Sequence, residues 1–189
     1  MTISAYAKAI DDVLRPIGFK KKRHVWNRNH ENYIDVVDMQ IAKSGDGLAI
    51  NIGVFEREIY TECWQERGPE FVDEASCIVR TRLGQLIDGK DRWWKLGDPD
   101  GLREVKKALG EFGLEFVERM HSARGMELFL DESGVRKSYY PLPAIYLAII
   151  ILKSGNRSDG CQLLQELKGR NTGDWQRRVD YILDKHCEH

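Results

Sequence analysis

The spacing of the apolar residues changes twice along the chain, and this change limits the fold more than any single motif does. Residues 3–17 place apolar side chains every three or four positions, which is typical of an amphipathic helix. Residues 19–56 alternate apolar and polar side chains, as half-buried strands do. From Asp98 onward the helical spacing returns. The pattern predicts an α+β fold: an antiparallel sheet of about four strands packed on an N-terminal helix, followed by an all-helical C-terminal half.

Turn and capping residues set the bounds of the expected elements. Strands are predicted at residues 19–29, 33–42, 48–56 and 77–83. The intervening stretch 57–75 is predicted to be a loop. Helices are predicted at residues 3–15, from 98 to 120, and at 123–130, 142–153, 158–168 and 173–186. Gly110 and Gly113 leave open whether the segment after Asp98 is one helix or two. We expect an α+β domain at 1–97 and a helical part at 98–189, packed as one compact unit.

Composition and charge exclude several classes of protein. With 42% hydrophobic and 31% charged residues, the chain is expected to fold and not to be disordered. A formal net charge of −1 argues against a general nucleic-acid binder, which usually has a basic face. The longest apolar run, 144–152, is shorter than the ~20 residues that span a bilayer, so no membrane helix is expected. Residues 1–14 lack the apolar core of a signal peptide, which predicts a cytoplasmic location.

The cysteines and the C-terminal tail are candidate sites of covalent or metal chemistry. The four cysteines are spread through the chain, at Cys63, Cys77, Cys161 and Cys187. No two of them form a CxxC pair, and a reducing cytoplasm predicts free thiols. Residues 185–189 contain three possible metal ligands, but structural zinc needs four ligands in a fixed geometry. We therefore predict a solvated tail and expect neither a metal nor a cofactor.

A family resemblance is carried by six short segments in the N-terminal half. They are GFKKK at 18–22, WNR at 26–28, DMQ at 38–40, INIGV at 50–54, CIVRTRLG at 77–84 and DRWW at 91–94. In this order and spacing they resemble the bacterial domain-of-unknown-function family 4304, over about residues 3–97. The family has no established activity, so the resemblance implies no catalytic residues. By analogy alone, small proteins of this kind sometimes act as immunity or interaction partners.

The N-terminal 30 residues are basic, with seven Lys and Arg against two Asp. Cations and an aromatic residue close together could contact phosphates and stack on bases, which makes nucleic-acid binding one hypothesis. The alternative is a solvated connection whose lysines protect an edge strand from pairing with other chains, and we favour it. The residues of the nucleic-acid hypothesis are Lys20, Lys21, Lys22, Arg23, Trp26 and Arg28.

A second group of candidate residues lies on the predicted sheet and beyond it. Arg80 and Arg82 are two positions apart and would share one face of a strand, where they could bind an anion or pair with acidic residues of the chain itself. Adjacent Trp93 and Trp94 cannot both face one core on a strand, so one of them is expected at the surface as an anchor for a protein partner. Asn51 on the third predicted strand completes this candidate binding surface.

Motifs of known enzyme chemistry are absent from the sequence. It contains no phosphate-binding GxxxxGK[ST], no GxGxxG, no HExxH and no GxSxG. We therefore expect a non-enzymatic binding protein, immunity-type or assembly-type, whose partner is another protein. Nucleic-acid binding through residues 20–28 and a hydrolase or nuclease without a recognisable motif remain the alternatives. The sequence gives no information on the oligomeric state.

Overall fold

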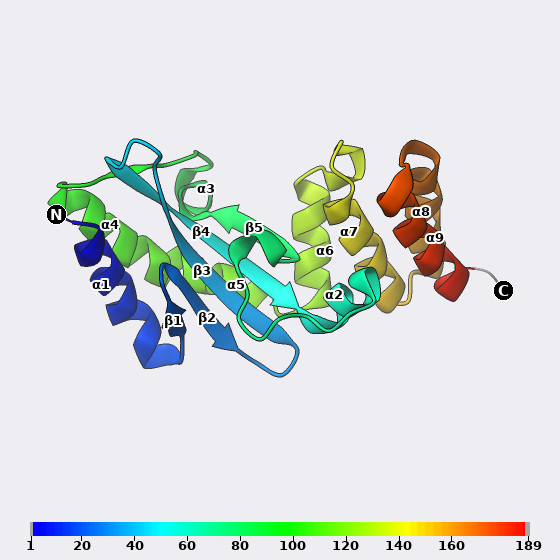
Figure 1. Cartoon of the computed structure of the whole chain (residues 1–189), viewed down its shortest axis with the longest axis horizontal. Helices are drawn as coiled ribbons and strands as arrows, with labels where there is room; N and C mark the ends of the chain where they lie inside the picture. Colours follow the sequence, from blue (N-terminus) through cyan, green and yellow to red (C-terminus); the bar gives the residue numbers. More distant parts are fainter. Residues whose placement is uncertain (1, 188–189) are drawn as a thin grey trace. The chain divides into compact units, whose positions relative to one another are not determined.

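The computed structural model of the chain describes residues 2–187. Its helices are α1 (Ile3–Leu14), α2 (Arg57–Trp64), α3 (Leu83–Asp88), α4 (Pro99–Ala108), α5 (Leu114–Arg119), α6 (Ala123–Glu132), α7 (Leu142–Lys153), α8 (Arg157–Arg170) and α9 (Gly173–His186). Its strands are β1 (Lys20–Lys22), β2 (Val25–Asn29), β3 (Tyr33–Ile41), β4 (Gly47–Glu56), β5 (Val79–Arg82) and β6 (Trp94–Lys95). The predicted α+β fold, with an antiparallel sheet, an N-terminal helix and a helical C-terminal half, is confirmed (Figure 1).

The chain forms two compact units. The sheet unit comprises the described residues up to Phe55 together with Glu70–Glu118, and the helical unit comprises Glu56–Pro69 and the described residues from Arg119 onward. These units do not divide at the predicted position between residues 97 and 98, because α4 contacts α1 and the π-helical turn after α4 contacts α3. The expected α+β domain at 1–97 and helical part at 98–189 stay a prediction, since a compact unit need not be a domain that folds alone.

The sheet has the strand order β1-β2-β3-β4-β5, with β6 paired to β4. The segment 19–29, predicted as one strand, is instead the hairpin β1–β2, in which Lys20 lies opposite Asn27. Arg23 makes the turn with a φ of 58°, which is a left-handed conformation. Because Gly or Asn usually occupies such a position and neither is present here, the turn was not predicted. β1 is at one end of the strand order, so its lysines lie on an edge strand, as the preferred interpretation of this segment expects.

One face of the sheet is covered by helices. Trp26 is fully buried, and its Nε1 donates to Asp11 Oδ1 of α1 at 2.6 Å. Of the two glycines that left open one helix or two after Asp98, Gly113 lies where the helix approaches the sheet. A Cβ on Gly113 would lie 2.9 Å from Ile52 Cδ1, and the helix passes this point as a π-helical turn, Leu109–Gly113, without breaking into two separate helices.

The opposite face of the sheet is covered only in part. The side-chain amide of Asn27 accepts a hydrogen bond from the backbone N–H of Val72 and donates one to the backbone oxygen of Val72. The chain around Val72 therefore lies on this face. A Cβ on Gly53 would lie 2.7 Å from Cys77 Sγ, which shows how closely this chain approaches β4. Farther along, the side chains of Asp38, Gln40, Asn51 and Arg82 occupy the same face, which we call the polar face.

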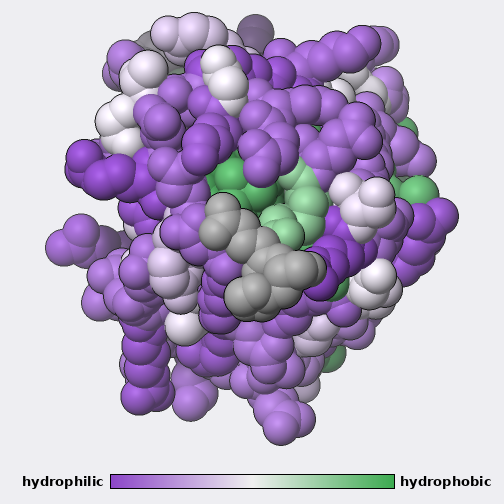
Figure 2. All heavy atoms as spheres, turned by 90° about the vertical axis from the view of Figure 1, so that its right-hand side faces the viewer, coloured by the Kyte–Doolittle hydropathy of each residue, from purple (hydrophilic) through white to green (hydrophobic). Residues whose placement is uncertain are grey.

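The helical unit is built around the apolar helix α7, and α6, α7, α8 and α9 stand side by side (Figure 1). Residues 57–64 were predicted as loop but form α2. Glu56 caps this helix by accepting from the backbone N–H of Ile59. The helix has only eight residues, which is too short for the spacing of its apolar side chains to identify it. The face that carries α8 and α9 is mostly hydrophilic, with a small apolar area near its centre (Figure 2). No helix within residues 2–187 is long and apolar enough to cross a membrane.

The predictions for the cysteines and the tail are partly wrong. Cys161 of α8 and Cys187 at the end of α9 form a disulfide, while Cys63 and Cys77 are buried free thiols. The two bonded cysteines are 26 positions apart in the sequence, so no short motif such as CxxC marks them as a pair. They come together only when α8 and α9 fold into a hairpin. The tail is helical through His186, whose Nε2 lies 2.9 Å from Glu62 Oε1. Its last two residues, 188–189, lie outside the described part of the chain.

Candidate functional site

The polar face brings two of the predicted site residues, Asn51 and Arg82, into one region. Asn51 on β4 lies opposite Arg82 on β5, as the strand register requires. Asn51 is 6% exposed, and its Nδ2 donates to Asp38 Oδ2 at 3.0 Å and to Gln40 Oε1 at 3.2 Å. Arg82 Nη2 donates to the same Gln40 oxygen at 3.1 Å. A continuous hydrogen-bonded chain therefore joins Asp38 to Arg82 across three strands.

Both predicted arginines are paired inside the chain. Arg80 Nη1 lies 3.3 Å from Glu74 Oε2, and Arg82 bonds Asp91. The sequence left open which acidic residues of the chain would pair with them, and the structure supplies carboxylates from the chain on either side of β5. Of the two alternatives for these arginines, the structure contains the ion pairs with acidic residues of the chain itself.

The two tryptophans divide as the strand alternation predicts. Trp94 is 4% exposed, and its Nε1 donates to Glu104 Oε2 at 2.8 Å. Trp93 is 39% exposed, and the Arg82 guanidinium carbon lies 5.0 Å from its ring centroid. This distance is a cation–π contact, which orients the exposed ring. Trp93 thus belongs to the polar face, whereas Trp94 is a core residue.

Burial changes the proton affinities of two carboxyl groups on this face. Burial raises the pKa of Asp38 above its ordinary value, although the hydrogen bond from Asn51 acts in the opposite direction. Burial also raises the pKa of Glu74, with Arg80 opposing and the neighbouring charge of Asp38 reinforcing the shift. Glu74 is the carboxylate paired with Arg80, and the hydrolase alternative would depend on carboxyl groups such as these two.

Two residues of this region were missed by the sequence-based prediction. Gln40 follows Asp38 by two positions on β3, so the period of a strand alone could have placed it on the same face. Glu74 lies in the stretch predicted as loop, and no sequence pattern connected it with Arg80. The first could have been found from the sequence and the second could not.

The basic segment provides less for nucleic acid than its sequence suggested. Trp26 is fully buried, so its ring is not available to stack on a base. Lys21 Nζ lies 3.3 Å from Asp11 and 4.6 Å from the Trp26 centroid, and Arg28 Nε donates to Asp35 Oδ2 at 2.7 Å.

Three cations of this segment are exposed, namely Lys20, Lys22 and Arg23. Lys22 Nζ lies 5.7 Å from the centroid of the Phe71 ring. Nucleic-acid binding through this segment stays a prediction, now limited to phosphate contacts from an edge strand and its turn.

Comparison with known proteins agrees with the resemblance seen in the sequence. The family described as Domain of unknown function (DUF4304) matches residues 10–118, which is more than half of the chain. The chain belongs to the DUF4304 family. The match extends past residue 97 and ends at the last residue of the sheet unit, so the DUF4304 region includes α4 and most of α5. No curated protein and no solved structure matches the chain.

Removing the charge of Asp38 should stabilise the protein at neutral pH. A carboxyl whose folded pKa is raised favours folding when protonated, so its ionisation opposes folding above that pKa. In Asp38→Asn the amide oxygen still accepts from Asn51, but the buried charge is gone. We expect a higher free energy of unfolding than wild type at pH 7, and a difference that disappears as the pH falls towards the ordinary value of 3.8.

Urea unfolding at several pH values measures this difference. Asp91→Asn is the matched control, because the hydrogen bond from Arg82 lowers the pKa of the exposed Asp91 and its charge should not oppose folding. A lower stability of Asp38→Asn than of wild type at pH 7 would contradict the prediction.

Proposed function

We propose that this DUF4304 protein is a non-enzymatic binding protein that docks another protein on the polar face, with Trp93 as the anchor. The observation that carries the proposal is the exposed Trp93 ring held against the Arg82 guanidinium at 5.0 Å. Tryptophan and arginine are enriched among the residues that dominate binding energy in protein interfaces. Both belong to a rigid framework, since Arg82 also bonds Gln40 and Asp91. Binding would therefore cost little loss of side-chain freedom.

The surroundings of Trp93 suit the rim of a protein interface. Arg80 with Glu74 and Arg82 with Asp91 provide charges of both signs around the ring. Such a rim is polar and hydrated, while an apolar pocket of the partner would cover the ring. An immunity-type role, a bacterial origin and a cytoplasmic location are the finer parts of this proposal. The buried free thiols Cys63 and Cys77 fit a reducing compartment, whereas the Cys161–Cys187 disulfide is the bond that such a compartment would oppose.

Replacing Trp93 with alanine should abolish capture of the partner without unfolding the protein. Loss of a central tryptophan typically costs 2 kcal/mol or more of binding free energy, which is about 30-fold in affinity. Phe112→Ala is the matched control, because Phe112 is also in the sheet unit and is also 39% exposed. The measurement is a quantitative pull-down from the native host with wild type and both variants, in nuclease-treated and untreated arms.

A stoichiometric protein band that survives nuclease, is lost with Trp93→Ala and is retained with Phe112→Ala supports the proposal. Equal capture by all three proteins would place the interface elsewhere and overturn it. A band that disappears after nuclease treatment would instead favour the exposed cations of the basic segment.

A further inference from the structure

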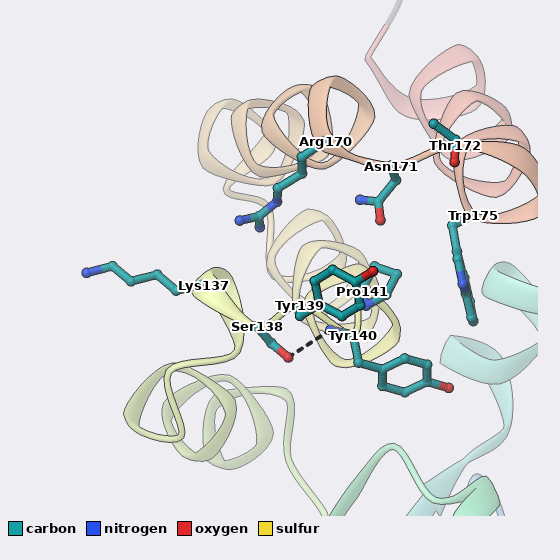
Figure 3. A pocket seen from close by; sticks show the side chains of 9 residues that line it. All are labelled: Lys137, Ser138, Tyr139, Tyr140, Pro141, Arg170, Asn171, Thr172 and Trp175. Carbon is teal, nitrogen blue, oxygen red and sulfur yellow. Dashed lines mark hydrogen bonds between the residues drawn. The ribbon is translucent and has the colours of Figure 1, made fainter.

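The helical unit contains a cavity of about 490 Å³ between the segment that leads into α7 and the connection from α8 to α9. Tyr139, Tyr140 and Trp175 line it together with Lys137, Arg170 and Asn171 (Figure 3). Its volume falls within the range of small-molecule sites, roughly 300–1,000 Å³. The cavity lies entirely within the helical unit, so its ligand is independent of the function proposed for the polar face.

Three aromatic rings border the cavity. Tyr140 and Trp175 meet edge to face, with centroids 5.7 Å apart and planes at 89°, which holds both rings in position. Tyr139 is fully exposed, so its ring contributes no burial to the fold. In Figure 3 the rings of Tyr139 and Tyr140 lie below the side chains of Arg170 and Asn171, and Trp175 stands at one side. Aromatic faces around a cavity favour a ligand that contains a flat ring.

The charged residues of the cavity are cations. Lys137 and Arg170 line it, and none of the described lining residues is acidic. Arg170 Nη2 donates to the Arg136 backbone oxygen, and a guanidinium has further N–H groups that can donate to a ligand. Asp174, which follows the cavity residue Thr172 by two positions, is paired with Arg177. The cavity therefore favours an anionic group beside the ring.

The start of α9 adds donors at the same place. Thr172 lines the cavity and occupies the N-cap position of α9, but its side chain makes no capping hydrogen bond. The first N–H groups of a helix lack partners within the helix and attract anions. This feature adds to the cations and aromatic rings and supports the same class of ligand.

We propose that the cavity binds a small organic anion in which a phosphate is attached to a flat ring, as in a nucleoside monophosphate. The ring packs against Tyr139 and Trp175, and the phosphate accepts hydrogen bonds from Arg170, with Lys137 free to approach it. Arginine suits this role because its planar donors match two phosphate oxygens at once.

Titration of the full chain with adenosine 5′-monophosphate, adenosine and inorganic phosphate tests the proposal, with calorimetry and tryptophan fluorescence as readouts. We expect saturable binding of the monophosphate with a Kd below about 1 mM and weaker binding of each fragment. Binding of phosphate as tight as that of the monophosphate would remove the role of the ring. Binding of adenosine as tight as that of the monophosphate would remove the role of the anion. A Kd above about 1 mM for the monophosphate would overturn the site itself.

Two variants connect binding with this cavity. Tyr139→Ala should leave the fold unchanged, because the ring is exposed, and should weaken binding about fivefold or more. Arg170→Glu should weaken it about tenfold or more. Arg157→Glu is the matched control, since it makes the same charge change on the same helix but at the opposite end. Unchanged affinity in Tyr139→Ala and Arg170→Glu, or an equal loss in Arg157→Glu, would overturn the assignment of the ligand to the cavity.

Discussion

Replacing Arg28 with alanine is expected to lower the free energy of unfolding by about 3–5 kcal/mol, because it removes one partner of a buried ion pair. Asp35 on β3 has no exposed side-chain surface, and Arg28 Nε donates to its Oδ2 at 2.7 Å. Arg28 also bonds Glu118 and lies with its guanidinium carbon 5.1 Å from the centroid of the Phe19 ring. The substitution removes the arginine from this buried carboxylate, which keeps its contact with His30 Nε2 at 2.9 Å, and it also removes packing.

Chemical unfolding of three variants separates this loss from the general effect of removing an arginine. Arg103→Ala removes an exposed ion pair with Asp100, and its cost should stay within about 0.5 kcal/mol. The double variant Arg28→Ala with Asp35→Asn should recover part of the loss, because it removes the buried charge of Asp35 together with the arginine that balances it. Equal costs for Arg28→Ala and Arg103→Ala would show that the buried pair contributes no more than a surface pair.

The sequence predicted the fold class because the change of hydrophobic period reflects which side chains each element buries. On β4 the alternation from Leu48 to Val54 identified a strand, and the spacing along α7 and α9 gave their bounds to the residue. The prediction was wrong where local backbone geometry decided the structure. The turn at Arg23 and the cap of Glu56 on α2 depend on single residues, which a periodic pattern does not reveal.

For the candidate site, the sequence could predict only which residues of one strand lie on the same face of the sheet. Strand alternation predicted that one of Trp93 and Trp94 would reach the surface, and the strand period could have added Gln40 to Asn51 and Arg82. The partners of Arg80 and Arg82 come from outside the strands: Glu74 begins a short 3₁₀ helix before β5, and Asp91 lies in the segment after α3. Contacts of this kind depend on the path by which the chain comes back to the sheet. The spacing of apolar residues in a single sequence predicts helices and strands but not this path.

Loss of the Cys161–Cys187 disulfide is expected to lower the free energy of unfolding by about 3.5 kcal/mol. The bond closes a loop with a sequence separation of 26, and a cross-link of that length removes about this much conformational freedom from the unfolded chain. The bond also fastens the end of α9 to α8, so its absence should let the last turn of α9 open first.

Urea unfolding with and without reductant measures the effect in wild type and in Cys161→Ser with Cys187→Ser. Wild type should lose stability on reduction, whereas the double variant should start at the lower value and not respond to reductant. Thiol counting on the denatured, unreduced wild-type protein should give the two free cysteines Cys63 and Cys77. Four reactive thiols would contradict the bond. The same count on protein quenched directly from cells tests the proposed cytoplasmic location. A reducing compartment would keep Cys161 and Cys187 as free thiols, and the helical unit would then have the lower stability expected without the disulfide.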